Sequence, residues 1–355
     1  MDYQRGLLDV MHEPARRLVA GYVISSLGIL VAISGGTWDV TNHLLNKPET
    51  FFSPPHAALY SGAGTALAGA IIVISASRAA KRTSWPAKLV LAGVSLLLAA
   101  GPIDFAWHSA FGLDGLLSPP HSVLVSGMVA SSVAAAIGIS TAYPRLDRKA
   151  LSLSLVLVAL LPVWISAAGA IHMFSLPFSK TGFFDFNPEP RAGAIVATLG
   201  FPIITAAIVV AASALFGRRL GVVTVLGAAF IFVGTLTSIL PNDALWSTIP
   251  FYVSALIPLA CADAVLSRWK SQYSIIVAGA IAGLAFVVLY YPLITHTYEE
   301  AMQNRTVWAS LTALIYFDIL GTMFPLVSVP AASMGIVGAL VGQKMAQRAE
   351  LAVLK

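Results

Sequence analysis

The chain alternates between long apolar stretches and short polar segments. Apolar windows of about 20 residues, the length of helix that crosses a bilayer, recur ten times along the sequence. They lie at 18–38, 57–77, 88–107, 122–142, 150–172, 192–215, 220–240, 248–266, 274–295 and 325–346. The pattern predicts an all-α polytopic membrane protein with about ten transmembrane helices. Because Pro325 and Pro330 interrupt the last apolar region, we expect 307–324 to form a re-entrant or interfacial segment before the final span.

Clusters of lysine and arginine predict the orientation of these spans. Six clusters fall on alternate connections, namely Arg16 and Arg17; Arg78, Lys81, Arg82 and Lys88; Arg145, Arg148 and Lys149; Arg218 and Arg219; Arg268 and Lys270; Lys344 and Arg348. Cytoplasmic loops are enriched in Lys and Arg, so we expect the clusters and both termini in the cytoplasm. The loops 38–56, 104–121, 172–191, 241–247 and 296–306 then face the extracytoplasmic side, and they contain six of the seven histidines.

Composition narrows the class of protein. The chain has 355 residues, of which 57% are hydrophobic and 10% charged, whereas soluble domains carry roughly 25% charge. This excludes a soluble enzyme or nucleic-acid-binding protein as the main interpretation, and the net charge of +5 belongs to the topology clusters. The single Cys261 excludes an internal disulfide, a cysteine-rich zinc site and an iron–sulfur cluster. We interpret 1–355 as one integral domain of the plasma membrane, with lipid as a partner and no nucleic acid.

Two outer loops carry the same pattern of residues. Residues 36–62 read GTWDVTNHLLNKPETFFSPPHAALYSG, and residues 101–127 read GPIDFAWHSAFGLDGLLSPPHSVLVSG. Both fit G-x2-D-x3-H-x9-S-P-P-H-x4-S-G without a gap, at a constant offset of 65 residues. Each copy ends one span and begins the next, which predicts a tandem parallel repeat of a helical hairpin. Repeat A covers 18–80 and repeat B covers 88–145, and the remaining helices cover 150–346.

The repeated residues are suited to bind a metal ion. Asp39 and His43, like Asp104 and His108, are four residues apart, so each pair lies on one face of a helix. The Pro-Pro pair that follows suits the first turn of the returning helix, and it places a second histidine, His56 or His121, where it can reach back to the pair. One Asp and two His leave coordination positions open, as in a catalytic site. Copper, iron and zinc all accept this set, and a hydrogen-bonded clamp without metal is the alternative.

The motif D-x3-H-x12-H, with T-x-F-S-P before its last histidine, resembles the metal-binding motif of the third integral subunit of membrane-bound copper monooxygenases. These are particulate methane monooxygenase and ammonia monooxygenase. The resemblance rests on Asp39, His43, Glu49, Thr50, Phe52, Ser53, Pro54 and His56, and in the second copy on Asp104, Trp107, His108, Asp114, Ser118, Pro119 and His121. It implies a copper site on the outer face, activation of oxygen with electrons from an external donor, and other subunits as partners. The chain differs from that subunit in carrying two copies of the motif.

Further polar residues of the outer loops are candidates for a lid or for groups that orient a ligand imidazole. They are Glu49, Asp114, His172, Asp185, Glu189 and Arg191. His172 ends the fifth span, and the last three lie in the segment FFDFNPEPRAG that follows it. For that segment we favour a structural loop tied by an ion pair from Arg191 to Glu189 or Asp185, and the lid is the functional alternative.

Three functions fit the pattern. The leading hypothesis is a metal-dependent, copper-containing oxidoreductase or a subunit of a monooxygenase complex, acting on a small substrate at the outer face. The second is a permease or metal-handling protein in which Asp263 or Asp318 passes a cation inward. The third is a non-catalytic scaffold subunit stabilised by metal. The ligands lie at the outer ends of the helices and the middle of the first four spans is apolar, which favours the first over the second.

Overall fold

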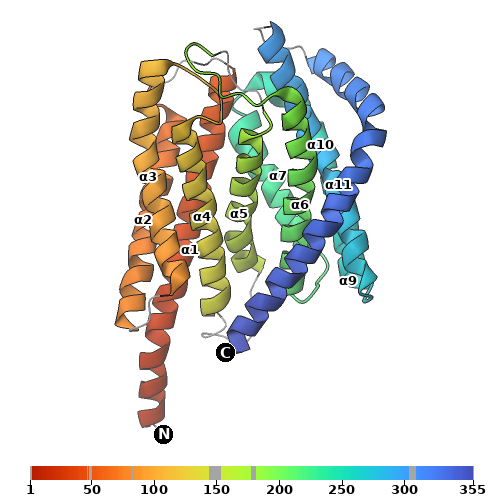
Figure 1. The fold of residues 1–355 in the computed structure, drawn as a ribbon. Helices are drawn as coiled ribbons and strands as arrows, with labels where there is room; N and C mark the ends of the chain where they lie inside the picture. The colour runs from red at the N-terminus through yellow and green to blue at the C-terminus, as the bar shows by residue number, and fades with distance from the viewer. Residues whose placement is uncertain are drawn as a thin grey trace.

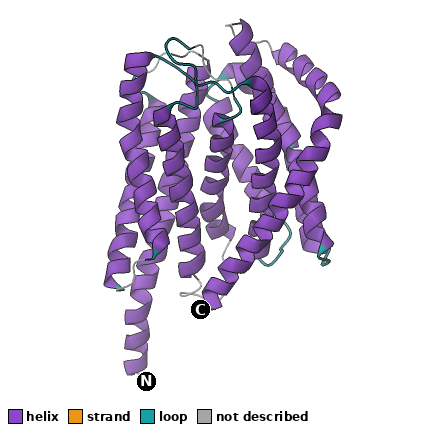
Figure 2. Cartoon of the chain, in the orientation of Figure 1, coloured by secondary structure: helices purple, strands orange, loops and turns teal. Residues whose placement is uncertain are grey.

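The protein is a bundle of long helices in the computed structural model (Figure 1). The structure describes residues 2–45, 47, 50–80, 84–143, 153–176, 181–303 and 309–354. The helices are α1 (Asp2–Leu44), α2 (Pro54–Ala79), α3 (Trp85–Phe111), α4 (Pro119–Ala142), α5 (Leu153–Met173), α6 (Pro190–Leu215), α7 (Val222–Gly234), α8 (Ile249–Ser254), α9 (Leu256–Arg268), α10 (Tyr273–Gln303) and α11 (Ala309–Leu354). A π-helical turn, η2 (Thr235–Ile239), and a 3-10 helix, η3 (Asp243–Thr248), follow α7. The described residues form no strand, and loops join the helices at the two ends of the bundle (Figure 2).

The predicted class of an all-α polytopic membrane protein is confirmed. Among the described residues, nine helical segments are long and apolar enough to cross a membrane, and Tyr273–Leu289 of α10 is a shorter apolar helix at the position of a tenth. Figure 1 places the two ends of the chain toward the same end of the bundle, as an even number of crossings requires. That this end is cytoplasmic stays a prediction.

The C-terminal region forms one long helix. Residues 309–324 are the first part of α11, a helix of 46 residues that contains Pro325 and Pro330, and its segment that is apolar enough to cross a membrane begins at Phe324. That the part before this segment is re-entrant or interfacial stays a prediction. Figure 1 shows α11 bent in its upper part. A proline removes one backbone hydrogen bond and kinks a helix without ending it where neighbouring turns continue. The two prolines therefore bend one element instead of separating two.

Glycines bring the first four helices together in two matching pairs. In α1 and α2, a Cβ atom added to Gly28 would collide with the backbone of Ala66, and one added to Gly62 would collide with that of Ala32. The same contacts recur 65 residues later in α3 and α4, where Gly93 faces Ser131 and Gly127 faces Leu97. Small residues allow this close approach of helix backbones. The two hairpins thus share their crossing as well as their loop motif.

The two intramembrane carboxylates considered for ion passage have other environments. Asp263 of α9 is fully buried, and its Oδ2 accepts hydrogen bonds from the backbone N–H of Gly221 (2.8 Å), the backbone N–H of Thr224 (3.1 Å) and the Thr224 hydroxyl (2.7 Å). It therefore caps the N-terminus of α7 from a neighbouring helix. Asp318 of α11 is exposed. Neither residue lines the cavity described below.

Candidate metal centre

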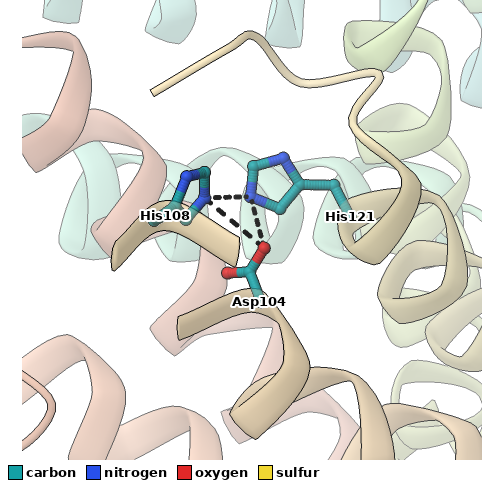
Figure 3. Close-up of side chains that lie close together, drawn as sticks. All are labelled: Asp104, His108 and His121. Carbon is teal, nitrogen blue, oxygen red and sulfur yellow. Dashed lines mark hydrogen bonds and ion pairs between the residues drawn. The ribbon is translucent and has the colours of Figure 1, made fainter. Parts of the chain in front are cut away.

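The second repeat brings its three candidate ligands together at the upper end of α3 and α4. Asp104 and His108 lie one turn apart in α3, and His121 follows Pro119 and Pro120 in the first turn of α4. His121 Nε2 lies 3.2 Å from Asp104 Oδ1, His108 Nε2 lies 3.4 Å from the same oxygen, and the two Nε2 atoms are 3.3 Å apart (Figure 3). Within the described part of the chain, this is the one group of three or more His, Cys, Asp or Glu whose ligand atoms all lie within 4.8 Å.

These three distances have the size expected around a four-coordinate metal ion. With bonds of about 2.0–2.1 Å, two ligand atoms of a tetrahedral site lie about 3.3–3.4 Å apart. The triangle of Oδ1 and two Nε2 atoms therefore matches one face of such a tetrahedron, and among the described residues no fourth His, Cys, Asp or Glu joins the group. Each of the three side chains is between 13 and 19% exposed.

The second ring nitrogen of each histidine fixes which atom is free to bind. His108 Nδ1 lies 3.1 Å from the carbonyl oxygen of Gly112, and His121 Nδ1 lies 3.2 Å from that of Gly115. A carbonyl only accepts hydrogen bonds, so each Nδ1 donates, and each Nε2 of the neutral ring carries a lone pair. Two lone pairs and a carboxylate oxygen then converge on one point. A cation at that point would bind all three, and hydrogen bonds to backbone carbonyls commonly orient metal-ligating histidines in this way.

The loop between α3 and α4 owes its shape to two glycines. Gly112 and Gly115 both have positive φ, 74° and 104°, which a residue with a Cβ adopts at a cost. Gly115 also packs directly on the backbone of Phe186 and Asn187. The carbonyls of these two glycines are the ones that orient His108 and His121.

The first repeat resembles this arrangement, with one shorter and one longer distance to the carboxylate. His56 Nε2 lies 2.8 Å and His43 Nε2 lies 3.8 Å from Asp39 Oδ1. His56 Nδ1 donates to the carbonyl of Thr50 at 2.9 Å, and Thr50 is the counterpart of Gly115 at the offset of 65 residues. The helix starts also match, since α2 begins at Pro54 and α4 at Pro119. The repeat therefore extends from the sequence motif to the orientation of its second imidazole, that of His56 or His121.

The two sets adjoin each other across one cavity. The rings of His43 and His108 meet edge to face with their centroids 6.1 Å apart. A cavity of about 620 Å³ is lined by all six candidate ligands, Asp39, His43, His56, Asp104, His108 and His121. Its other walls are largely aliphatic and aromatic side chains of α1, α3, α4, α5 and α7. Metal ions in the two sets would share this apolar space.

The additional candidate residues have different surroundings. His172 in the last turn of α5 lines the cavity, and its ring packs on Phe201 of α6 with centroids 5.0 Å apart. Asp114 is fully buried outside the cavity lining, where its Oδ2 accepts a hydrogen bond of 2.6 Å from Trp107 Nε1 and its carbonyl accepts one from the N–H of Phe186. Glu49 lies outside the described residues.

For the segment after α5, a structural loop was the favoured prediction and a lid over the site was the alternative, and the structure gives its polar residues local structural roles. Asp185 Oδ1 accepts from the N–H of Asn187 at 3.0 Å. Glu189 is the N-cap of α6, since its carboxylate accepts from the N–H of Ala192 at 2.8 Å, and these backbone donors lower the pKa of its carboxyl group. Arg191 lies in the exposed first turn of the same helix. None of the three lines the cavity, so a lid role for these side chains is not supported, because backbone groups of the loop itself bind the two carboxylates.

Two tyrosines that line the cavity were not predicted from the sequence. Tyr60 of α2 and Tyr252 of α8 both line it, and Tyr60 packs on Gly101. Tyr60 lies one turn after His56, so a search along the helix face of the ligand could have found it. Tyr252 had no such signal, because its helix reaches the cavity through a tertiary contact.

Comparison with known proteins gives this chain no relative: no protein-family model, no curated protein and no solved structure matches it.

Proposed function

We propose that the protein is a copper-dependent oxidoreductase of the monooxygenase type, by itself or as the metal-carrying subunit of a larger complex. One observation carries the proposal. Asp104 Oδ1, His108 Nε2 and His121 Nε2 form a triangle with sides of 3.2 to 3.4 Å, and this triangle borders a cavity of organic-molecule size. A closed structural site would use a fourth protein ligand, whereas an open position suits dioxygen or substrate.

The ligand set and the resemblance of the motif together support copper. One carboxylate and two imidazoles at this spacing are compatible with zinc and with copper(I), which both accept tetrahedral sites. Of these two, copper changes oxidation state. The resemblance to the copper monooxygenase motif supports the same choice.

The proposed reaction inserts one oxygen atom into a C–H bond of the substrate. Dioxygen, two protons and two electrons from an external donor such as a quinol convert R–H to R–OH and water. Bound copper would supply the binding and reduction of dioxygen. The chain itself contributes two carboxylates that offset the charge of the ions, four imidazoles held by backbone carbonyls or helix position, and an apolar wall that excludes water.

The alternative function, a permease, has less support. It required Asp263 or Asp318 to receive the cation, but Asp263 is engaged with three donors at the start of α7, and Asp318 is exposed on α11. A scaffold role would leave the open coordination position without use. Both alternatives are outcomes of the following experiment.

The test is a redox cycle followed by electron paramagnetic resonance. The full chain, purified in detergent and loaded with copper, is expected to give a Cu(II) signal that disappears with a soluble quinol and returns on exposure to air. His56→Asn combined with His121→Asn removes one nitrogen ligand from each set, and we expect the signal to be lost. His12→Ala is the matched control, since His12 precedes His43 by 31 residues in α1, about 45 Å along the helix axis.

A wild-type chain that holds zinc but no copper would contradict the oxidoreductase and favour the scaffold. A copper signal that persists in the double variant would contradict the ligand assignment. Elution volume and thermal unfolding of each variant show whether it is folded.

A further inference from the structure

The cavity beside the two sets is large for a gas molecule. Its volume of about 620 Å³ lies in the range of roughly 300–1,000 Å³ that is typical of sites for drug-sized organic molecules. It extends from the candidate ligands on α1 to α4 to residues of α5, η2 and α8. A substrate such as methane or ammonia would fill only a small part of this space.

Glycines keep part of the space free. Gly169 of α5 and Gly234 of α7 both line the cavity, and a Cβ atom added to either would have no neighbour within 4 Å. Neither glycine has a positive φ that would require it for the backbone. Side chains at these two positions would project into open volume, so their absence leaves room for a ligand.

Most of the wall is apolar, and some of its polar groups bond to one another. The Thr37 and Thr237 hydroxyls bond to each other at 3.1 Å, and Ser166 Oγ bonds to Ser132 Oγ at 2.9 Å. The hydroxyls of Tyr60 and Tyr252 and the ring nitrogens of His172 also belong to the lining, and they make no such hydrogen bond within the described part of the chain. Tyr252 is 7% exposed, so a ligand in the cavity would supply the partner that its hydroxyl needs.

The backbone near these groups is also irregular. The π-helical turn η2 places Thr237 and Ser238 on the cavity wall. Short π-helical turns are rare in proteins, and those that do occur are frequently found at functional sites. Thr237 contacts Thr37, which precedes the candidate ligand Asp39 by two residues, so the turn connects the wall to the first set.

We infer that this cavity binds a neutral, largely apolar organic molecule with one hydrogen-bonding end group, which Tyr252 and His172 receive while the apolar body extends toward the metal sets. The inference rests on the proposed function, since it names the substrate class of the same site. It replaces the small substrate expected from the sequence with a larger organic molecule as the proposed substrate. An anionic molecule is disfavoured because the one ammonium group of the lining, that of Lys47, bonds to the carbonyl of Pro241 at 3.0 Å, and the two lining carboxylates, Asp39 and Asp104, belong to the proposed metal sets.

The experiment uses two fluorinated probes that differ by one hydroxyl, 10-fluorodecan-1-ol and 1-fluorodecane. Their binding to the detergent-solubilised full chain is followed by fluorine NMR, with empty micelles subtracted. Saturable binding is expected for the alcohol and weaker binding for the alkane. Tyr252→Phe and His172→Phe should each weaken alcohol binding about three- to tenfold, the effect of one hydrogen bond, and leave alkane binding unchanged.

A cavity-filling variant tests the location. Gly169→Leu should weaken both probes at least tenfold, because its side chain occupies the space where they would lie. Gly64→Leu is the matched control, since Gly64 of α2 also has nothing within 4 Å but is exposed and does not line the cavity.

Equal binding of both probes by the wild type and Gly169→Leu would overturn the inference, as would equal alcohol binding by Tyr252→Phe, His172→Phe and the wild type. The same titration on the variant with Asp39→Asn and Asp104→Asn separates this result from the metal proposal. Alcohol binding that keeps its dependence on Tyr252 in that variant supports the substrate class whether or not the wild type holds copper.

Discussion

At the scale of single residues, the site depends on which nitrogen of each imidazole faces the carboxylate. The sequence identified Asp104, His108 and His121 by type and spacing, but it could not show that Nδ1 of each histidine donates to a glycine carbonyl. That detail depends on how the loop between α3 and α4 folds. These hydrogen bonds explain why a loop with two glycines at positive φ lies between the ligands His108 and His121.

The half-buried Trp107 and the buried Asp114 form a hydrogen-bonded pair that supports this loop, and the loss of this bond should be measurable. Trp107→Phe keeps an aromatic ring but removes the donor at 2.6 Å from Asp114 Oδ2. Leaving a buried carboxylate without this donor is expected to lower the free energy of unfolding by about 1–3 kcal/mol. Chemical denaturation of the detergent-solubilised protein measures it. If the indole served only to cover the loop, Trp107→Phe would unfold at the wild-type denaturant concentration.

At the scale of elements, the two hairpins are the part of the fold that the sequence predicted best. The offset of 65 residues predicted the matching ligand sets, and α2 and α4 begin at the expected prolines. The π-helical turn η2, the division of the eighth span into η3, α8 and α9, and the continuous α11 were not predicted. Each of these depends on packing against other helices, which hydrophobic periodicity does not encode.

The glycine crossings make a prediction about each hairpin separately. Gly28→Val should force α1 away from α2, lower stability by about 1–3 kcal/mol, and weaken metal binding at Asp39, His43 and His56 while the second set keeps its ion. Gly93→Val should do the reverse in α3 and α4. Metal analysis and thermal unfolding of both variants check this, with Gly64→Val as a control of equal chemistry. A common loss of all metal in both variants would show that the sets do not follow their own hairpins.

The N-cap of α6 predicts a dependence on pH. The N–H groups of Ala192 and Arg191 lower the pKa of Glu189 below its ordinary value. The charged cap therefore contributes stability at neutral pH, and this contribution disappears as the pH falls through the lowered pKa. Thermal unfolding of Glu189→Gln should differ from the wild type at pH 7 and approach it in acid. A difference that is constant with pH would mean that the charge of Glu189 does not act on the helix.

At the scale of the whole molecule, the sequence predicted the class of fold but not the cavity. Five histidines share one cavity because α1 to α5 converge there, and its depth depends on Tyr252 and Gly234, which lie far from the motifs in the chain. Such a volume results from the summed packing of several helices. No local pattern could have indicated it.

The orientation of the bundle in the membrane can be tested with single cysteines. In a Cys261→Ser background, Asp185→Cys lies in the exposed loop before α6 and Lys270→Cys in the exposed turn before α10. If the basic clusters are cytoplasmic, a membrane-impermeant maleimide added to intact cells should label Asp185→Cys and reach Lys270→Cys only after lysis. Labelling in the opposite order would place the histidine sets on the cytoplasmic side.

The central claim is that each repeat holds one metal ion through its Asp and two His. The most direct measurement is the metal content of the purified, copper-replete protein beside Asp39→Asn, Asp104→Asn and the double variant, which keep side-chain volume but remove the negative charge. We expect roughly two copper ions per chain in the wild type, roughly one in each single variant and almost none in the double variant. A wild-type protein without metal, or a folded double variant that retains both ions, would contradict the account.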